Sequence, residues 1–569
     1  MGMIDVLWAT LHPDTGPRGF WDQGILEELF AGTLARLPAG VGFVHREVSG
    51  VEVTAVCAGL GGTGRGAVVV IPGGHNQGRE AEFGAALSAL DWCLLIVTSD
   101  EEDLFDPDGV TSHLVAGRHV LWWQTPPVGR CGEDGWRALP IGFRAGTVGQ
   151  AAGLRDGWLW HERAIFATFA GQVTHARREQ ALAALAALPD TVRVRVAPTD
   201  RFAAGLGWDD YLTTLGQARW APCPSGPVCL ETFRMWEALE MGAVPIVDLL
   251  TPGTQDPAGG HDYWRRVLGK GHPLLLVDEW GAGLDWVGRY DRGFNDRLMA
   301  VRTEAWWQEF KRGLARDLCD DLTGLGAPMP EQERVTVLMP TSPIPSHPST
   351  AILDETVASV VERLPGAEIV LMIDGVRREQ HETHDADYTA YLERVLDWTR
   401  RTPDVTPLLH DRHTHQVGMT RHALGLVRTP NVLFVEHDTP LAGDIPAGQI
   451  LDVLDNDLAD LVRLHHETAI PPEHDYLMDG LDTVGLVPVV WTRQWSQRPH
   501  FARTGWYQSR LDESCPAGYV GMIEDRLHGI VQSEDPSRWR LAIYHPEYGS
   551  IKRSGHLDGR GDDPKWPES

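Results

Sequence analysis

The sequence of 569 residues predicts an α/β protein with three units built around parallel sheets. Apolar runs of strand length, such as residues 67–71 and 93–98, alternate with longer segments of helical periodicity. This alternation is typical of parallel sheets that are covered by helices on both faces. A hydrophobic content of 43% and a charged content of 23% are ordinary for folded domains and exclude wholesale disorder.

The expected elements of the first two units follow this alternation. In the first unit, we expect strands at residues 67–71, 93–98 and 119–124 and a helix near residues 79–90. In the second unit, we expect strands at residues 164–170, 192–197, 244–248 and 273–277, and helices at residues 174–188, 231–241 and 304–318. Because Pro72-Gly73-Gly74 ends the first of these strands, we expect ligand-facing loops at the carboxyl ends of the strands.

A segment rich in Gly and Pro, residues 323–330, interrupts the pattern and is interpreted as a linker. The expected division of the chain is 1–154, 155–325, 326–333 (linker) and 334–569. The last segment repeats the alternation, with strands expected at 335–339, 368–373 and 432–435 and helices at 353–364, 388–400 and 416–427. It therefore resembles a further nucleotide-binding α/β domain.

Charge and composition narrow the classes of function. A formal net charge of −29 argues against a protein whose whole surface wraps nucleic acid or anionic membrane, although it allows a local basic site. The seven cysteines include no C-x-x-C pair, which favours reduced thiols. No signal peptide is visible, and no apolar run approaches the roughly 20 residues that span a bilayer. We therefore expect a soluble cytoplasmic protein without a membrane span, and its oligomeric state is left open.

Residues 221–247 hold the densest group of candidate binding residues in the second unit. Ser225 and Gly226 form a turn before a helix, where free N–H groups and the helix dipole favour a phosphate. Glu231, Arg234 and Glu237 are three residues apart and are expected on one helix face. An Arg fork suits a diphosphate and a carboxylate can hold sugar hydroxyls, while a surface helix with ion pairs is the structural alternative.

The same stretch resembles the donor-binding half of exostosin-type glycosyltransferases, which have the two-lobed GT-B fold. The family pattern is matched in order by Thr232, Arg234, Glu237-Ala238, Gly242 and Pro245-Ile246, and upstream by residues 163–171 and Arg177. The turn reads Pro224-Ser225-Gly226 where the family usually has Arg-Gly. The resemblance implies an acceptor lobe in residues 1–154 and a donor-binding lobe in residues 155–325. The implied donor-binding residues are Ser225, Gly226, Glu231, Thr232, Arg234 and Glu237.

The third unit carries a triplet with two acids at the end of an expected strand, Glu436-His437-Asp438. Alternate residues at a strand end point the same way, so Glu436 and Asp438 can share one hard divalent cation. Mg²⁺ or Mn²⁺ would then act as a Lewis acid on the leaving diphosphate. The triplet departs from the usual Asp-x-Asp, which leaves the choice of metal, and a metal-independent enzyme, open.

The order of motifs in this unit resembles GT-A glycosyltransferases. The resemblance implies that Thr341, Asp374 and Gly375 hold the nucleoside and that Arg421 meets the diphosphate. Glu524 and Asp525 resemble the Glu-Asp pair of inverting members, in which Asp525 would take the proton of the acceptor hydroxyl. His556 is placed where a third metal ligand often occurs. Acids that merely complement a helix dipole are the structural alternative for Glu524 and Asp525.

A candidate acceptor surface lies between Asp482 and Asp512, a window without any acid. Aromatic rings interleaved with Arg suit an extended anionic polymer, because they offer stacking faces and charges. The candidate acceptor residues are Arg493, Trp495, Arg498, Arg503 and Trp506. An amphipathic helix with a buried aromatic face is the structural alternative. With this surface, the acceptor would be an acidic glycan or a nucleic acid.

Together these patterns predict a glycosyltransferase with an exostosin-like GT-B module followed by a GT-A module. The expected donor is a nucleotide sugar, with a UDP-sugar favoured, and the GT-A module is expected to be inverting and metal-dependent. Two alternatives stay open at this point. One is an enzyme that resembles phage DNA glycosyltransferases acting on hydroxymethylated bases, and the other is a non-catalytic protein whose degenerate modules bind glycans or nucleotides.

Overall fold

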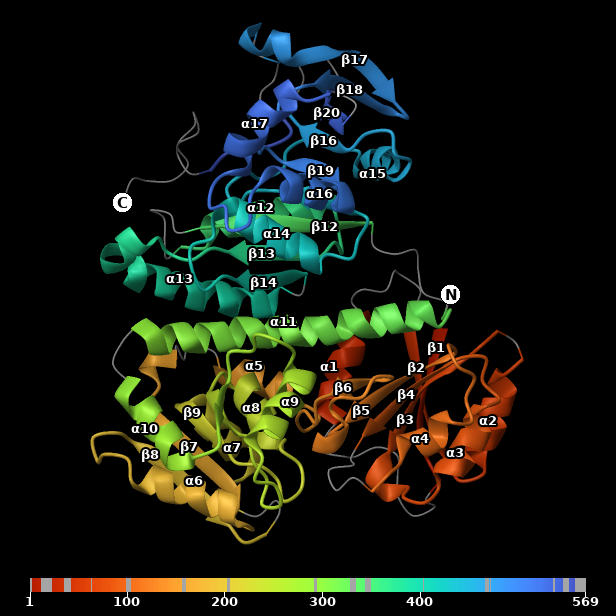
Figure 1. Cartoon of the computed structure of the whole chain (residues 1–569), viewed down its shortest axis with the longest axis vertical. Coiled ribbons are helices and arrows are strands. Elements are labelled where there is room, and N and C mark those ends of the chain that lie inside the picture. The colour runs from red at the N-terminus through yellow and green to blue at the C-terminus, as the bar shows by residue number, and fades with distance from the viewer. Residues whose placement is uncertain are drawn as a thin grey trace. The chain divides into compact units, whose positions relative to one another are not determined.

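The computed structural model forms two compact units, Met1–Pro330 and Glu331–Ser569 (Figure 1). It describes residues 3–11, 23–34, 42–62, 64–98, 104–155, 160–201, 205–290, 294–327, 334–342, 349–402, 404–465, 470, 472–535, 538–545 and 552–557. The expected linker at residues 326–333 spans the boundary between the units, and residues 328–333 lie outside the described residues.

The first sheet of unit 1 has six parallel strands in the order β2-β1-β3-β4-β5-β6. The strands are β1 (Met3–Thr10), β2 (Gly42–Ser49), β3 (Ala67–Pro72), β4 (Cys93–Thr98), β5 (His119–Gln124) and β6 (Trp136–Leu139). The helices are α1 (Gln23–Leu34), α2 (Glu52–Leu60), α3 (Glu80–Leu87), α4 (Pro107–Thr111) and α5 (Thr147–Arg155). Every residue of β3 and β4 is buried, as expected for strands covered on both faces.

The second sheet of unit 1 has five parallel strands in the order β11-β10-β9-β7-β8. The strands are β7 (Ile165–Gln172), β8 (Val194–Thr199), β9 (Ala218–Cys223), β10 (Val244–Asp248) and β11 (Leu275–Val277). The helices are α6 (Ala176–Ala186), α7 (Trp208–Gly216), α8 (Phe233–Glu240), α9 (Pro257–Leu268) and α10 (Trp280–Tyr290). The strand order reverses between β7 and β9, and such a reversal opens a crevice at the carboxyl ends of the strands.

The helix α11 (Phe294–Gly324) joins the two sheets into one unit, packing against α1 and against α8 (Figure 1). Lys311 on this helix donates to Glu240 of α8 at 2.5 Å and lies 3.5 Å from Glu28 of α1. Near the end of α11, Asp321 accepts a hydrogen bond of 2.8 Å from the indole of Trp122 in β5. The apolar core of unit 1 includes one cluster with side chains from both sheets.

Unit 2 contains a nine-stranded mixed sheet in the order β14-β13-β12-β15-β19-β16-β20-β18-β17. The strands are β12 (Val335–Thr341), β13 (Ile369–Ile373), β14 (Val405–Leu409), β15 (Asn431–Phe434), β16 (Leu461–Leu464), β17 (Met478–Val484), β18 (Val487–Thr492), β19 (His500–Arg503) and β20 (Leu541–Tyr544). The helices are α12 (Ala351–Arg363), α13 (His381–Arg401), α14 (His415–Leu426), α15 (Ala447–Asp455), α16 (Thr504–Ser514) and α17 (Ile523–Ser533). Strands β12 to β15 are parallel, and β19 is antiparallel to both of its neighbours.

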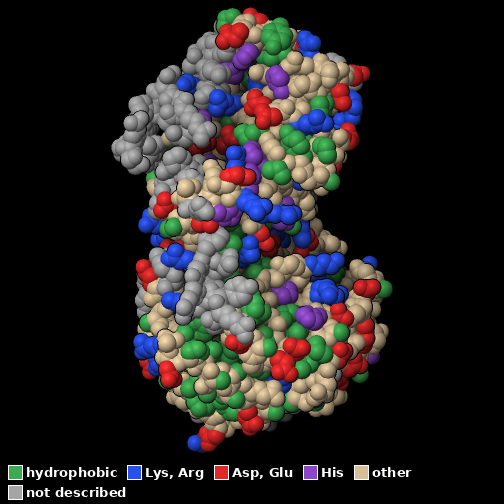
Figure 2. All heavy atoms as spheres, turned by 60° about the vertical axis from the view of Figure 1, so that its left-hand side comes forward, with side chains coloured by type: hydrophobic (Ala, Val, Ile, Leu, Met, Phe, Trp, Pro, Cys, Tyr) green, Lys and Arg blue, Asp and Glu red, His purple; other side chains and the backbone are tan. Residues whose placement is uncertain are grey.

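The predicted fold class, α/β with Rossmann-like parallel sheets, is confirmed. The strands β1, β2 and β9 and the antiparallel half of the third sheet were not anticipated from the sequence. Among the described helices, none combines the length and apolar character needed to cross a membrane. Figure 2 shows Asp and Glu side chains interspersed with Lys and Arg over one face of the molecule, in keeping with the acidic net charge.

Candidate functional site

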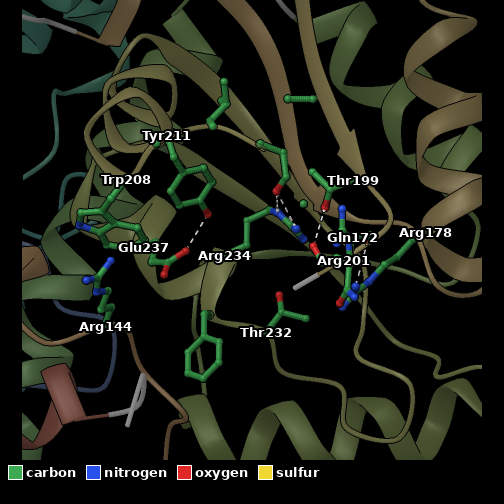
Figure 3. Close-up of a pocket in the computed structure, with 16 residues that line it drawn as sticks. Arg144, Gln172, Arg178, Thr199, Arg201, Trp208, Tyr211, Thr232, Arg234 and Glu237 are labelled. Carbon is green, nitrogen blue, oxygen red and sulfur yellow. Dashed lines mark hydrogen bonds between the residues drawn. The ribbon is translucent and has the colours of Figure 1, made fainter. Parts of the chain in front are cut away.

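A pocket of about 370 Å³ lies at the carboxyl ends of β7 and β8, beside the starts of α7 and α8 (Figure 3). This is the side of the sheet where the reversal of strand order predicts ligand binding. Its polar and aromatic lining includes Arg144, Gln172, Arg178, Thr199, Arg201, Trp208, Tyr211, Thr232, Phe233, Arg234 and Glu237. The lining therefore has four arginines and one acid, so the pocket favours an anion.

Arg234 is the central cation of the pocket, and it is 8% exposed. Its Nε and Nη2 atoms donate to the carbonyl of Ala170 at 3.1 and 2.8 Å, and the guanidinium lies 4.3 Å from the ring centre of Phe169. A Cβ atom at position 171 would lie 2.2 Å from Nη2, so only Gly171 leaves room for this side chain. The remaining Nη1 atom is buried without a hydrogen-bond partner among the described residues, which leaves it able to donate to a ligand.

Arg178, in the first turn of α6, lies on the same side of the pocket as Gln172 and Arg201 (Figure 3). It donates to the carbonyl of Gln172 at 3.0 Å and to that of Ser225 at 3.4 Å. Burial and the neighbouring charge of Arg234 lower the pKa of Arg178 to about 10. Within the described residues neither guanidinium forms an ion pair with a carboxylate, and a bound anion would relieve their repulsion.

The opposite side of the pocket is formed by Trp208, Tyr211, Glu237 and Arg144 (Figure 3). The Tyr211 hydroxyl donates to Glu237 at 2.6 Å. Burial raises the pKa of Glu237 to about 7, although the Tyr211 hydrogen bond and two arginines oppose this shift. The carboxyl group therefore titrates near neutral pH, and its ionised form can accept hydrogen bonds from hydroxyl groups.

The turn before α8 places two further polar groups at this end of the sheet. Thr232 is at the N-cap position of α8, but its hydroxyl makes no capping bond and is buried without a partner in the described part of the chain. Ser225 is completely buried, and its Oγ atom also lacks a partner there. Gly226 donates its backbone N–H to the carbonyl of Cys229 at 2.8 Å and so closes the turn.

Glu231 occupies a different environment from the one expected. The chain is still extended before α8, which begins at Phe233, so the helical spacing to Arg234 does not apply. Both oxygens of Glu231 are used inside the protein, by the backbone N–H of Ile141 at 2.8 Å, the indole of Trp236 at 3.0 Å and the hydroxyl of Tyr263 at 2.7 Å. We therefore correct its assignment from a sugar ligand to a buried connection within unit 1.

Sequence reasoning missed Arg144, Arg178, Trp208 and Tyr211. The family pattern included the adjacent Arg177, which forms a buried ion pair with Asp248, with N–O distances of 2.5 and 3.0 Å. The neighbouring Arg178 faces the pocket because adjacent residues on a helix point about 100° apart. Arg178 could have been predicted as a pocket residue from one feature of the sequence: it lies in the first turn of a helix that directly follows a strand.

In unit 2 the candidate metal ligands lie near one another but do not form a coordination group. Glu436 accepts a hydrogen bond of 2.9 Å from Gln416, and burial followed by the charge of Asp438 raises the pKa of Glu436 to about 8. The imidazole Nε2 of His556 lies 3.8 Å from Asp438. Among the described residues, no three His, Cys, Asp or Glu side chains are arranged to hold a metal ion. As placed, these residues do not fit the expected cation.

The two candidate catalytic acids differ in their surroundings. Glu524 accepts a hydrogen bond of 3.1 Å from the backbone of Gln497 and lies close enough to Glu436 to raise the pKa of that carboxyl. The charge of Arg498 opposes that shift, so Arg498 also lies near Glu436. Asp525 is exposed in the first turn of α17. Of the two acids, Glu524 is the one that the structure places beside Glu436.

The candidate donor residues of unit 2 are engaged with the protein itself. Asp374 is 1% exposed and accepts from the backbone N–H groups of Thr414 and His415 at 2.8 and 3.0 Å, which caps α14. Thr341 is hydrogen-bonded to the hydroxyl of Tyr391 at 2.8 Å.

Two other residues expected at this donor site also have structural roles. A Cβ at position 375 would lie 2.6 Å from the backbone of Arg412, so Gly375 serves a close backbone approach. Arg421 donates to the carbonyls of Leu511 at 2.7 Å, Cys515 at 2.5 Å and Pro516 at 3.2 Å. It therefore caps the end of α16. It also lines a pocket with Asp512 and Arg526, so its assignment as a diphosphate ligand stays a prediction.

The candidate acceptor surface belongs largely to the fold. Trp495 is 1% exposed and stacks on Trp506, with ring centres 6.4 Å apart, in the core cluster of unit 2. Arg503 forms ion pairs with Asp457 and Asp460, and Arg493 pairs with Asp479 at 3.0 Å. These four candidates are thus packed in the core or paired with acids, but they do not lie on one amphipathic helix: Arg503 is on β19, Trp506 is on α16, and the other two lie between β18 and β19. Arg498, which lies near Glu436, is the exception.

One protein-family model matches part of unit 1. The family described as RXYLT1 C-terminal domain, an exostosin-like xylosyltransferase family, matches residues 163–323. No curated protein matches the chain in sequence.

Two solved structures are similar to part of the chain. One is S. aureus TarS 1-349, with 12% identity, a TM-score of 0.27 and coverage of 40% of this chain and 60% of that one. The other is GalNAc-T7 with UDP, GalNAc and Mn²⁺, with 12% identity, a TM-score of 0.27 and coverage of 39% and 44%. The chain thus spans less than two thirds of either protein. The expected resemblance to exostosin-type enzymes is supported by the family match for residues 163–323, which carry most of the pocket lining.

Proposed function

We propose that the chain is a glycosyltransferase that uses a nucleotide sugar and binds it in the pocket of unit 1. This proposal rests mainly on two neighbouring arginines, Arg178 and Arg234, at the carboxyl ends of parallel strands. Neither arginine has an ion-pair partner in the described chain. Arg178 and Arg234 repel each other across the pocket, and Nη1 of Arg234 has no acceptor there. A nucleoside diphosphate supplies the missing negative charge and the missing acceptors. The match of residues 163–323 to a xylosyltransferase family supports the same interpretation.

The two sides of the pocket suit the two ends of a nucleotide. Trp208 and Tyr211 offer aromatic faces for a base, and the ionised carboxyl of Glu237 can accept hydrogen bonds from ribose hydroxyls. Arg234 and the start of α8 can hold a phosphate. When the bond between sugar and phosphate breaks, negative charge grows on the leaving diphosphate, and fixed guanidinium groups stabilise that charge. The favoured donor in this proposal is a UDP-sugar.

Unit 2 is proposed as a second, GT-A-type module that carries Glu524 near Glu436 and Arg498. In an inverting transfer, a carboxylate removes the proton of the acceptor hydroxyl as that oxygen attacks the anomeric carbon. Glu524 takes this role in preference to Asp525, because Glu524 lies beside the buried Glu436. No step is derived through Mg²⁺ or Mn²⁺, since the carboxylates and His556 do not form a coordination group among the described residues.

The acceptor is proposed to be a hydroxyl group on a glycan or a small molecule. The nucleic-acid alternative depended on an exposed basic and aromatic surface, and most of that surface is buried or paired with acids. We therefore expect no sugar transfer to hydroxymethylated duplex DNA, which serves as a negative control in the transfer assays.

The test is a titration of the full-length protein with UDP, followed by transfer assays with a panel of radiolabelled nucleotide sugars. Arg234→Ala should lower UDP affinity about tenfold or more, because a charge-assisted hydrogen bond is lost. Arg195→Ala is the matched control, since Arg195 is exposed on β8 of the same sheet and does not line the pocket. UDP binding without hydrolysis or transfer of any donor would favour the non-catalytic alternative. No UDP binding at all would refute the donor site.

A further inference from the structure

A buried ion pair in unit 1 joins Arg177, in the first turn of α6, to Asp248, the last residue of β10. The Nε and Nη2 atoms of Arg177 donate to the two carboxylate oxygens at 3.0 and 2.5 Å. Asp248 is completely buried, and neither residue lines the pocket. Burying two opposite charges removes their hydration, and their attraction only partly offsets that loss. The pair is therefore weak evidence for stabilisation, and it suits a role in fixing the local geometry.

The carboxylate of Asp248 also holds three other segments that meet at this end of the sheet. It accepts from the backbone N–H of Ser225 at 3.4 Å and from that of Leu250 at 3.1 Å. The indole of Trp280, the first residue of α10, donates to it at 3.2 Å. Because Arg177 lies on α6 and Ser225 lies in the turn before α8, Asp248 fixes that turn relative to the start of α6.

The same two segments hold Arg178, which lines the pocket (Figure 3). Arg178 follows Arg177 on α6, so the ion pair restrains the backbone that carries it. The Nε atom of Arg178 donates to the carbonyl of Ser225 at 3.4 Å, and its Nη1 atom donates to the carbonyl of Gln172 at 3.0 Å. Asp248 therefore acts on Arg178 in two ways, through Arg177 on the same helix and through the turn at Ser225.

Arg178 depends on this support because its surroundings oppose its position. Burial and the charge of Arg234 lower the pKa of Arg178 to about 10, so the two guanidinium groups repel each other. The hydrogen bonds of Arg178 in the described chain go to neutral carbonyls, which carry no charge to offset that repulsion. Side chains that bind a ligand keep a productive geometry when the residues behind them are fixed.

We infer that the ion pair between Arg177 and Asp248 positions Arg178 for donor binding. Neither member of the pair touches the ligand, and both act through Arg178. The inference rests on the proposed function, in which Arg178 contacts the phosphates of the donor, and it adds two positioning residues to that site. Loss of the pair should weaken the binding of a phosphate-bearing ligand and spare the binding of the nucleoside, because Trp208 and Tyr211 lie on the opposite side of the pocket.

The experiment is calorimetric titration of the full-length protein with UDP and with uridine, combined with thermal unfolding. Arg177→Met removes the charge and keeps much of the buried volume, and Asp248→Asn keeps the shape of the carboxylate. Each should weaken UDP binding by about three- to tenfold and change uridine binding by less than about twofold. Arg177→Lys keeps the charge without the two-pronged contact, so its UDP affinity should fall between those of the wild type and Arg177→Met.

Arg155→Met is the matched control, because it breaks another buried ion pair of unit 1 that does not line the pocket. Arg155 lies 2.8 Å from Glu304, and both side chains are 10% exposed. This variant should lower the unfolding temperature and leave the affinities for UDP and uridine unchanged. If Arg177→Met and Asp248→Asn behave in the same way as this control, the pair is only structural and the inference is refuted.

A double-mutant cycle tests whether Arg177 acts through Arg178. In an Arg178→Ala background, Arg177→Met should cause no further loss of UDP affinity, and a loss equal to that in the wild-type background would refute the inference. The donor site is tested separately by Arg234→Ala. If Arg234→Ala weakens UDP binding and Arg177→Met does not, the donor site stands and the positioning role fails. If the wild type binds no UDP, the donor site and this inference both fail.

Discussion

Glu231 provides a sharp test of whether a residue in the donor motif is a ligand or part of the scaffold. Its carboxylate accepts from the backbone N–H of Ile141, the indole of Trp236 and the hydroxyl of Tyr263, at 2.7–3.0 Å. Glu231→Ala leaves these three buried donors unpaired, at about 1–3 kcal/mol each, so unit 1 should lose about 3–9 kcal/mol. That is a large part of the roughly 5–15 kcal/mol by which domains are stable.

The assay is thermal unfolding combined with UDP titration. A loss of about 3–9 kcal/mol should lower the Tm of unit 1 by roughly 6 °C or more, on a scale of about 2–4 °C per kcal/mol for large domains. Glu231→Gln keeps one carbonyl acceptor for Ile141 and Trp236, so its loss should be about 1 kcal/mol and UDP affinity should stay within about twofold. Glu133→Ala, an exposed acid in the same unit, is the control. A Glu231→Gln protein with unchanged Tm but strongly reduced UDP affinity would show that Glu231 is a ligand after all.

Three further predictions concern the two units. In the proposed donor site, the ionised form of Glu237 binds ribose, and the pKa of Glu237 is about 7. The affinity for uridine should therefore rise as the pH increases through 7. Glu237→Gln should abolish this pH dependence in titrations between about pH 5.5 and 8.5. UDP binding to unit 1 depends on arginines, so EDTA or added Mn²⁺ should change its Kd by less than about twofold, and a larger change by calorimetry would contradict this. Glu524→Gln should slow sugar transfer by about 10²-fold or more, while Asp525→Asn should have a much smaller effect. If Asp525→Asn instead slows transfer more than Glu524→Gln, Asp525 is the catalytic base.

The fold was largely predictable because its strongest signals are local. Strands β3 and β4 are continuous apolar runs that are buried on both faces. Such a run can be identified as a strand from its own sequence, without knowing which strands pair with it. The strand β9 was missed because its sequence, Ala218–Cys223, includes Arg219 and Pro222 and has little apolar periodicity. The antiparallel strands of unit 2 are short and are fixed by pairing with distant segments, such as β19 with β15 and β16.

The acceptor surface shows why a charge pattern in one window misleads. The window from Asp482 to Asp512 lacks acids in sequence, but the fold brings acids to its arginines from elsewhere. Asp457 and Asp460 reach Arg503, and Asp479 reaches Arg493. A local excess of Arg in the sequence therefore indicates a binding surface only when the fold brings no carboxylate from elsewhere in the chain into ion pairs with those arginines.

The two units differ in how far their predicted ligand-binding groups have hydrogen-bond partners within the protein. In unit 2, Asp374 caps α14 and accepts hydrogen bonds from the protein through both of its oxygens. Arg421 donates to carbonyls at the end of α16, but its Nε atom has no hydrogen-bond partner among the described residues. In unit 1, Arg234 keeps an unpaired buried donor, and the hydroxyl groups of Ser225 and Thr232 have no hydrogen-bond partners in the described chain. Burying a polar group without a partner costs about 1–3 kcal/mol of folding free energy. Several such groups close together therefore indicate that a ligand supplies the missing hydrogen bonds. On this argument we propose that the motif around Arg234 is a binding site, whereas the equally recognisable Asp374 is explained by its structural role at the start of α14.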